Sequence, residues 1–265
     1  SVNAHEEGKI EVDTIITGYS PKLTVKWGFD GCEGLYAPNG NAGCDNVAMA
    51  QIMSYYQHPS STVLIYCTPP SSLTLDWSTM VLANTKHPHT STTCNLQIAS
   101  FVRQLGQLNN SIYHSSGVTS TSFTSVHSTF SQSFQYSVSS IKSYAREDFS
   151  NAFATNNLII MRGTSSNSDG DFTGHVWVVD GNIILRITTT MWRKLVSEEE
   201  WHLEDQSTTF QKYIHINWGW HGRNNGYFST NVLATQQAYS YDDPYMANYL
   251  NDSYNSGLYY FIVKH

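Results

Sequence analysis

Cys44 stands where a cysteine can act as a nucleophile. It follows Gly43 and opens the run "CDNVAMAQIMSYYQ", whose apolar residues recur at helical spacing. Backbone N–H groups at a helix N-terminus lack partners and the helix dipole is positive there, so both favour a thiolate. The N–H of Cys44 could also face a developing oxyanion. The alternative is a buried, inert cysteine.

His175 is the strongest candidate for a base. It follows Gly174 at the start of the apolar run "HVWVVD", which places it at the end of a strand. Its imidazole could take the thiol proton and later protonate a leaving amine. The alternative is a histidine at a strand end whose ring is hydrogen-bonded to the backbone.

A third block, "YIHINWGWHGRNNGYF", contributes Asn217 and Trp218. An asparagine can hold an imidazole in one tautomer, as in Cys-His-Asn enzymes, and an indole can exclude water. The alternatives for this block are a tight turn with aromatic side chains that pack in the core, or an aromatic platform that binds sugars.

Helices must position these groups in the first part of the chain and strands in the second. Apolar spacing predicts helices over residues 44–57, 94–109, 122–132 and 146–156, and the first is apolar nearly all round, which is typical of a buried helix. Residues 1–43 read as extended segments and loops. After residue 157 the chain consists of short β-branched and aromatic runs between Gly, Asn and Asp residues. This order predicts an α+β fold with an antiparallel sheet.

Composition limits the class of protein. Of 265 residues, 40% are hydrophobic and only 13% are charged, a pattern that favours a secreted, periplasmic or cell-surface location. The net charge of −7 argues against nucleic-acid binding. No apolar run is long enough to span a membrane. The first residues, "SVNAHEEGKIEV", are not a signal peptide, so we expect a secreted form to have lost one. We also expect a monomer.

The remaining cysteines allow one disulfide. Cys32, Cys67 and Cys94 form no CxxC pair, which argues against a zinc ribbon or a thioredoxin motif, and the sequence does not select the pair. His87 and His89, taken with Cys94, match no standard metal-ligand spacing. We therefore predict neither a metal nor a cofactor.

Three blocks together resemble the streptopain family, peptidase family C10. They are "AGCDNVAMAQIMSYY", "GHVWVVDG" and "HINWGWHGRNNGYF", in this order and with similar spacing. The segments "TVKWG" at 24–28, "LDWSTM" at 75–80 and "SSGVTSTSFTSVHSTF" at 115–130 resemble the family as well. The resemblance implies a single peptidase domain over 1–265, with a papain-like two-lobed fold. A helical N-terminal lobe (about 1–156) would pack on an antiparallel β lobe (about 157–265).

The resemblance also implies roles. Cys44 matches the nucleophile, His175 the general base, Trp218 the tryptophan that flanks the histidine, and Asn217 precedes it as in the family. Gly174 and Ser120 match positions that contact the substrate backbone. Residues 233–256 fall where the family has a mobile loop beside the cleft. The implied activity is an endopeptidase that cleaves protein substrates through a thioester and prefers an apolar residue just before the scissile residue.

Two positions depart from the family pattern. The family entry segment carries a Gln whose amide serves the oxyanion hole, and here that position is Phe29; His221 replaces a glycine. Losing one such donor costs roughly 10²–10³ in rate. Either another group such as Asn39 or Asn41 replaces it, or catalysis is slow, or the enzyme cleaves an unusual substrate. A weakened family member that binds peptides or a host protein, a carbohydrate-binding module and a transglutaminase-like enzyme are the alternatives.

Overall fold

The computed structural model describes residues 5–83, 94–166, 172–247 and 249–265. Its helices and helical turns are α1 (Cys44–Tyr56), α2 (Trp77–Ala83), α3 (Leu96–Leu108), α4 (Phe123–Ser128), the π-helical turn η2 (Thr129–Ser133), α5 (Ser150–Ala154) and the 3₁₀ turn η3 (Pro244–Met246). The predicted helices are thus present but shorter than expected, and α2 was not predicted. Residues 87 and 89, raised as metal ligands, lie outside the described residues.

Most strands belong to one antiparallel sheet. They are β1 (Glu6–Tyr19), β6 (Ser137–Val138), β7 (Lys142–Ser143), β8 (Leu158–Ser166), β9 (Phe172–Leu195), β10 (His202–Asn217), β11 (Gly226–Ser229), β12 (Ala238–Tyr241) and β13 (Tyr254–Lys264). Their order is β12-β11-β10-β9-β8-β13-β6, with β1 on β9 and β7 on β13. Small hairpins are formed by β2 (Ser61–Leu64) with β3 (Ser71–Thr74), and by β4 (Ile112–Tyr113) with β5 (Thr119–Ser120).

The α+β prediction is confirmed, because the helices come mainly from the first half and the sheet mainly from the second. The expected boundary near residue 156 is crossed, since β1, β6 and β7 join the sheet from the N-terminal side.

The sheet is covered on both faces near the centre of the molecule. Val176 and Val178 of β9 pack with α1, α3 and α4 in one core cluster. Trp177 and Val179 alternate onto the opposite face, where they pack with α5, β10 and β11 in a second cluster. This double burial explains the continuous apolar run in β9, which a half-exposed strand would not show.

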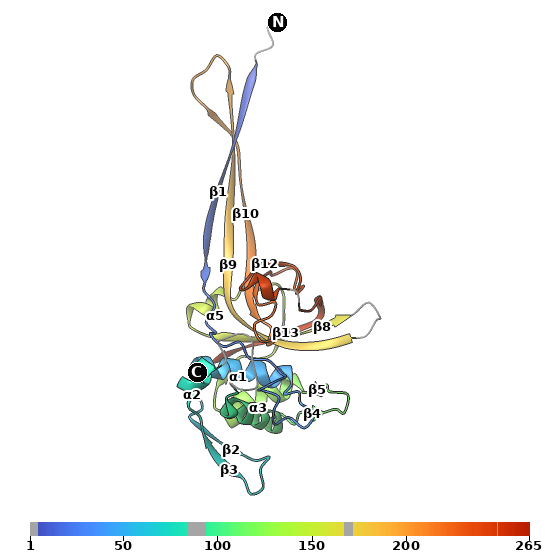
Figure 1. Cartoon of the computed structure of the whole chain (residues 1–265). Coiled ribbons are helices and arrows are strands. Elements are labelled where there is room, and N and C mark those ends of the chain that lie inside the picture. Colours follow the sequence, from blue (N-terminus) through green and yellow to red (C-terminus); the bar gives the residue numbers. More distant parts are fainter. Residues whose placement is uncertain (1–4, 84–93, 167–171, 248) are drawn as a thin grey trace.

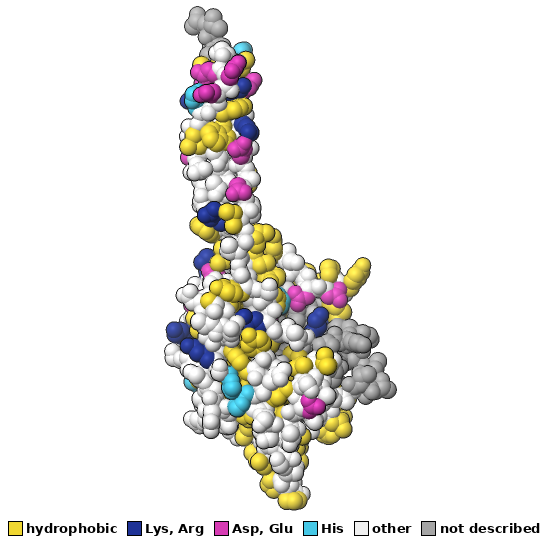
Figure 2. Space-filling model, turned by 90° about the vertical axis from the view of Figure 1, so that its left-hand side faces the viewer, with side chains coloured by type: hydrophobic (Ala, Val, Ile, Leu, Met, Phe, Trp, Pro, Cys, Tyr) yellow, Lys and Arg dark blue, Asp and Glu magenta, His cyan; other side chains and the backbone are white. Residues whose placement is uncertain are grey.

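A long three-stranded ribbon projects from the body (Figure 1), and it is formed by β1, the second half of β9 and the first half of β10. All fourteen residues of β1 are exposed. Side chains of Asp, Glu, Lys and Arg gather near the tip of the ribbon, and hydrophobic ones lie along its shaft (Figure 2). Residues 1–43 were expected to be extended segments and loops, but the ribbon could not be foreseen because β1 pairs with β9 across more than 160 positions, as in Glu11 with Thr190.

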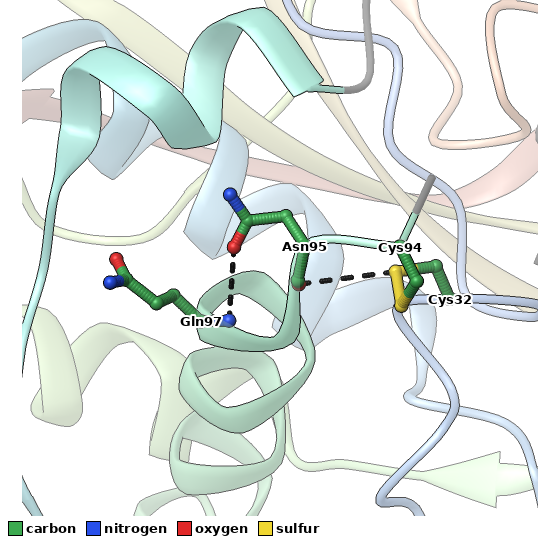
Figure 3. The surroundings of a disulfide bond; sticks show 4 residues. All are labelled: Cys32, Cys94, Asn95 and Gln97. Carbon is green, nitrogen blue, oxygen red and sulfur yellow. Dashed lines mark hydrogen bonds between the residues drawn. A yellow bond between two sulfur atoms is a disulfide. The ribbon is translucent and has the colours of Figure 1, made fainter. Parts of the chain in front are cut away.

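A disulfide joins Cys32 to Cys94, with the two Cα atoms 5.2 Å apart (Figure 3). It ties the loop before α1 to the start of α3, where the Asn95 side chain accepts a hydrogen bond from the Gln97 N–H at 3.0 Å. This bond caps the helix. Cys44 and Cys67 remain free thiols, so the structure selects one of the pairings that the sequence left open.

Two phenylalanines test whether the body contributes more than the ribbon to the free energy of unfolding. Phe101 is fully buried and packs edge-on against Trp77, with ring centroids 5.6 Å apart. Phe210 on the ribbon is 60% exposed. We expect Phe101→Ala to lower the free energy of unfolding by about 3–5 kcal/mol, and Phe210→Ala to change it by no more than about 0.5 kcal/mol. Urea titration followed by tryptophan fluorescence measures both, and equal losses would contradict the proposed division.

Candidate active site

Cys44 is held at the N-terminus of a helix that is buried on nearly every side. Residues 45–54 of α1 are all buried, and α1 packs against α3 and β9. Gly43 is the N-cap residue just before the helix, and its φ of 89° suits a glycine. A side chain at Gly43 would also press against Thr119, because a Cβ there would lie 3.0 Å from its methyl carbon. This close approach brings β5 against the start of α1.

Cys44 and His175 line the same cavity, which has a volume of about 780 Å³. The main chain of Val176, the residue after His175, forms a hydrogen bond to the Cys44 sulfur and favours its thiolate. The sulfur therefore lies beside the segment that carries the histidine. Gly174 and Ser120, the two expected substrate contacts, line this cavity as well. Among the described residues, a Cβ added to Gly174 would meet no atom within 4 Å, so the space beside its main chain is open.

The carbonyl oxygen of Trp218 orients His175. It lies 2.7 Å from Nε2 of the imidazole. A carbonyl only accepts hydrogen bonds, so Nε2 carries the proton and Nδ1 keeps its lone pair. Trp220 stacks nearest to the imidazole, at 4.7 Å between centroids, whereas Trp218 is 6.3 Å away. Trp218 thus contributes its main chain to the histidine, and the flanking indole is chiefly that of Trp220.

Asn217 does not hold the imidazole by its side chain, in contrast to the expectation. Its Oδ1 accepts hydrogen bonds from Gln51 Nε2 at 3.3 Å and from the Gly219 N–H at 3.0 Å. Its Nδ2 donates to the Val25 carbonyl at 3.0 Å. These bonds join α1, the entry segment and the turn after β10. The amide therefore positions the Trp218 carbonyl, and the carbonyl positions the histidine.

Neither Asn39 nor Asn41, the two expected substitutes, replaces the donor missing at Phe29. The Asn39 Nδ2 donates to the carbonyls of His114 and Val118. The Asn41 Nδ2 donates to the Gly117 carbonyl at 2.9 Å. Both amides are thus used to hold the loop around β5, and the Phe29 side chain lines the cavity without a polar group. The N–H of Cys44 remains as the donor that α1 offers at its N-terminus.

His221, the other departure, serves a packing role beside Phe29. Its Nε2 lies 2.5 Å from Oδ1 of Asp30. The ring fills the space above Gly28, where an added Cβ would come within 2.3 Å of Nε2. Gly28 in turn bridges to Trp220. The histidine therefore fixes the entry segment against the turn that carries Trp218 and Trp220.

Burial opposes charge on both reactive groups in the empty cavity. It lowers the pKa of His175 to about 4, although the Trp218 carbonyl acts in the opposite direction. Burial also raises the pKa of the Cys44 thiol, and the Asp45 carboxylate raises it further. Sγ of Cys44 donates to Oδ2 of Asp45 at 3.5 Å. The resting pair is therefore a neutral thiol and a neutral imidazole. The sequence reading missed Asp45, although its place beside Cys44 was a visible signal.

The cavity is also lined by Leu250, Asp252 and Tyr254. They belong to the segment 233–256, for which the sequence led us to expect a position beside the cleft.

No group of His, Cys, Asp and Glu side chains suited to a metal ion occurs among the described residues. Within the same residues, no helix is long and apolar enough to cross a membrane.

Comparisons with known proteins indicate a family and a fold. The model of the peptidase C10 family matches residues 19–228. Among solved structures, the active wild-type interpain A cysteine protease of Prevotella intermedia is similar, with a TM-score of 0.56 and 17% sequence identity; the match covers 93% of this chain and 94% of that chain. At this identity the likeness is one of fold. No curated protein matches the chain.

The effect of Asp45 on the thiol can be measured directly. Burial raises the pKa of Asp45 to about 6, so above this pH its charge holds the Cys44 proton in place. We expect Asp45→Asn to lower the pKa of Cys44 and to speed its alkylation by iodoacetamide at pH 7–9, by roughly tenfold for each unit of lowering. The difference should shrink below pH 6, where Asp45 is protonated in the parent. Mass spectrometry follows both free thiols, and Cys67 serves as the internal reference. An unchanged or slower reaction at Cys44 would contradict this account.

Proposed function

The chain belongs to the peptidase C10 family and is a cysteine peptidase, and from this premise we propose that it hydrolyses peptide bonds through a thioester on Cys44. His175 acts first as the general base and then as the general acid. The observation that carries the proposal is the shared cavity of Cys44 and His175, with the imidazole tautomer set by the Trp218 carbonyl.

The first step transfers the thiol proton to the free Nδ1 of His175. The sulfur then attacks the substrate carbonyl carbon and forms a tetrahedral oxyanion. The N–H of Cys44 at the start of α1 is the donor that we assign to this oxyanion. The neutral resting pair implies that charge separates only when substrate fills the cavity, since its amide groups then replace water around the reacting atoms.

The second half of the reaction returns the enzyme to its starting state. The Nδ1–H of the imidazolium protonates the leaving amine, and the C–N bond breaks to leave the thioester. A water molecule, deprotonated by Nδ1, attacks the thioester and releases the acid product, and the thiol is re-formed. Trp220 and Trp218 cover the imidazole and its carbonyl partner, which supports the exclusion of water from that hydrogen bond.

Substrate contacts and location complete the proposal. We assign Gly174 and Ser120 to the substrate backbone, and proteins or peptides are the partners. The disulfide between Cys32 and Cys94 supports a secreted, periplasmic or cell-surface location, because disulfides persist in oxidising compartments. A papain-like division into two lobes, with the cavity between them, is part of the same proposal. A monomeric state and the absence of nucleic-acid partners remain predictions.

A weakened family member that mainly binds peptides is the second candidate. Three observations favour it: Phe29 offers no donor to the cavity, and the pKa values of Cys44 and His175 are shifted toward their neutral forms. A peptide inhibitor with a thiol-reactive group separates the two cases. Labelling of Cys44 without measurable turnover of any peptide would support the binding protein.

Substitution of the reactive pair tests the proposed function. We expect Cys44→Ala and His175→Ala each to lower kcat/KM on a fluorogenic peptide by roughly 10⁴–10⁶-fold, and the double variant to lose no more than either single one, because the two residues act as a unit. Circular dichroism verifies the fold, and Cys67→Ala is the matched control that should keep parental activity. A folded Cys44→Ala variant that cleaves like the parent would refute the assignment.

A further inference from the structure

Arg162 brings a positive charge into the cavity that holds Cys44. It lies in β8, where it pairs with Val176 of β9. Side chains alternate along a strand, so Arg162 points to the same face as Ile160, and Ile160 belongs to the core cluster packed around α1. The cavity lining includes Arg162 together with Cys44 and Val176. The guanidinium is therefore directed toward the reacting end of the site.

The described part of the chain leaves this guanidinium without a hydrogen bond or an ion pair. Asp45 is close enough for Arg162 to lower its pKa, although burial has the larger, opposite effect. The Asp45 carboxylate accepts a hydrogen bond from the Cys44 thiol at 3.5 Å. Neither carboxylate oxygen of Asp45 lies within ion-pair distance of Arg162. A guanidinium carries five N–H donors in a fixed plane, and those of Arg162 are half-buried and accessible to an anion that enters the cavity.

The other charges of the lining are already engaged. Asp252 accepts hydrogen bonds from the Ser165 hydroxyl at 3.5 Å and from the Tyr254 hydroxyl at 3.3 Å. His175 is neutral, since its pKa lies at about 4. Arg162 is the one Lys or Arg among the described lining residues. The Arg162 guanidinium would repel a cation that enters the cavity, whereas an anion would accept hydrogen bonds from its N–H groups.

Part of the cavity wall is apolar, including Val176, the strand partner of Arg162. Val176, Phe123 and Val118 line the same cavity, and a methylene chain can lie against such side chains while its end group reaches the guanidinium. The pattern fits a side chain with an apolar stem and a carboxylate end. Carboxylates bind a guanidinium through two parallel hydrogen bonds, which are among the stronger ones in proteins.

We propose that Arg162 forms a specificity subsite for an acidic side chain of the substrate, glutamate above aspartate, at one position near the scissile bond. This rests on the proposed function, because it names the substrate class of the same site. The family resemblance implies a preference for an apolar substrate residue. The proposed subsite instead prefers an acidic residue, whose methylene groups would contact the apolar wall and whose carboxylate would bind Arg162.

Matched peptides test the subsite. They differ only by Glu or Gln, placed at each of three positions on either side of the cleaved bond. At one position we expect the parent to cleave the Glu peptide roughly 10- to 100-fold more efficiently in kcat/KM, the range of charge-assisted hydrogen bonds. Arg162→Gln should bring this ratio near one, and Arg162→Glu should favour a Lys peptide at the same position. Arg186→Gln, on the exposed ribbon, is the control and should keep the parental ratio.

Binding separates a failure of the subsite from a failure of the proposed function. If the parent cleaves no peptide, calorimetry on Cys44→Ala, with and without Arg162→Gln, measures the same Glu-to-Gln ratio as an affinity. Equal treatment of Glu and Gln by the parent at every position would overturn the subsite. A parental preference for Lys, or a ratio unaffected by Arg162→Gln, would overturn it as well.

Discussion

The burial of α1 against the sheet is the constraint on which the rest of the structure depends. The helix has apolar residues on nearly every side, so it is stable only when α3 covers one flank and β9 another. Its N-terminus, with Cys44, is thereby fixed at the edge of the sheet segment that carries His175. Cys44 and His175 are 131 positions apart in the sequence. They line one cavity because the apolar surface of α1 is buried against β9, the strand that carries His175.

The same burial sets the electrostatics of the site. A buried environment fixes the reacting groups, but it disfavours their charged forms, and Asp45 adds to this at the thiol. The geometry compensates through the helix N-terminus, the main chain of Val176 and the carbonyl of Trp218, all of which are backbone dipoles. The site thus relies on main-chain groups where side-chain amides were expected.

Asn217 illustrates how the support of the site extends outward. Its amide joins Val25, Gln51 and Gly219, three segments that are remote in sequence. A local change there would displace the Trp218 carbonyl and with it the histidine. His221 and Gly28 serve the same turn by packing. His221, one departure from the family pattern, is therefore part of this support, whereas Phe29, the other departure, lines the cavity together with Asp45 and Arg162.

Local sequence patterns predicted the helix that carries Cys44, the strand that carries His175, and the α+β order, because periodicity and turn residues act over a few positions. The sequence also marked the missing donor at Phe29. The fold was needed to establish the pairing of Cys32 with Cys94, the ribbon of β1 with β9, and the exchange of roles between Asn217, Trp218 and Trp220. It alone showed that Asp45 and Arg162 share the cavity. These depend on contacts between residues far apart in the chain, whose geometry local patterns do not encode.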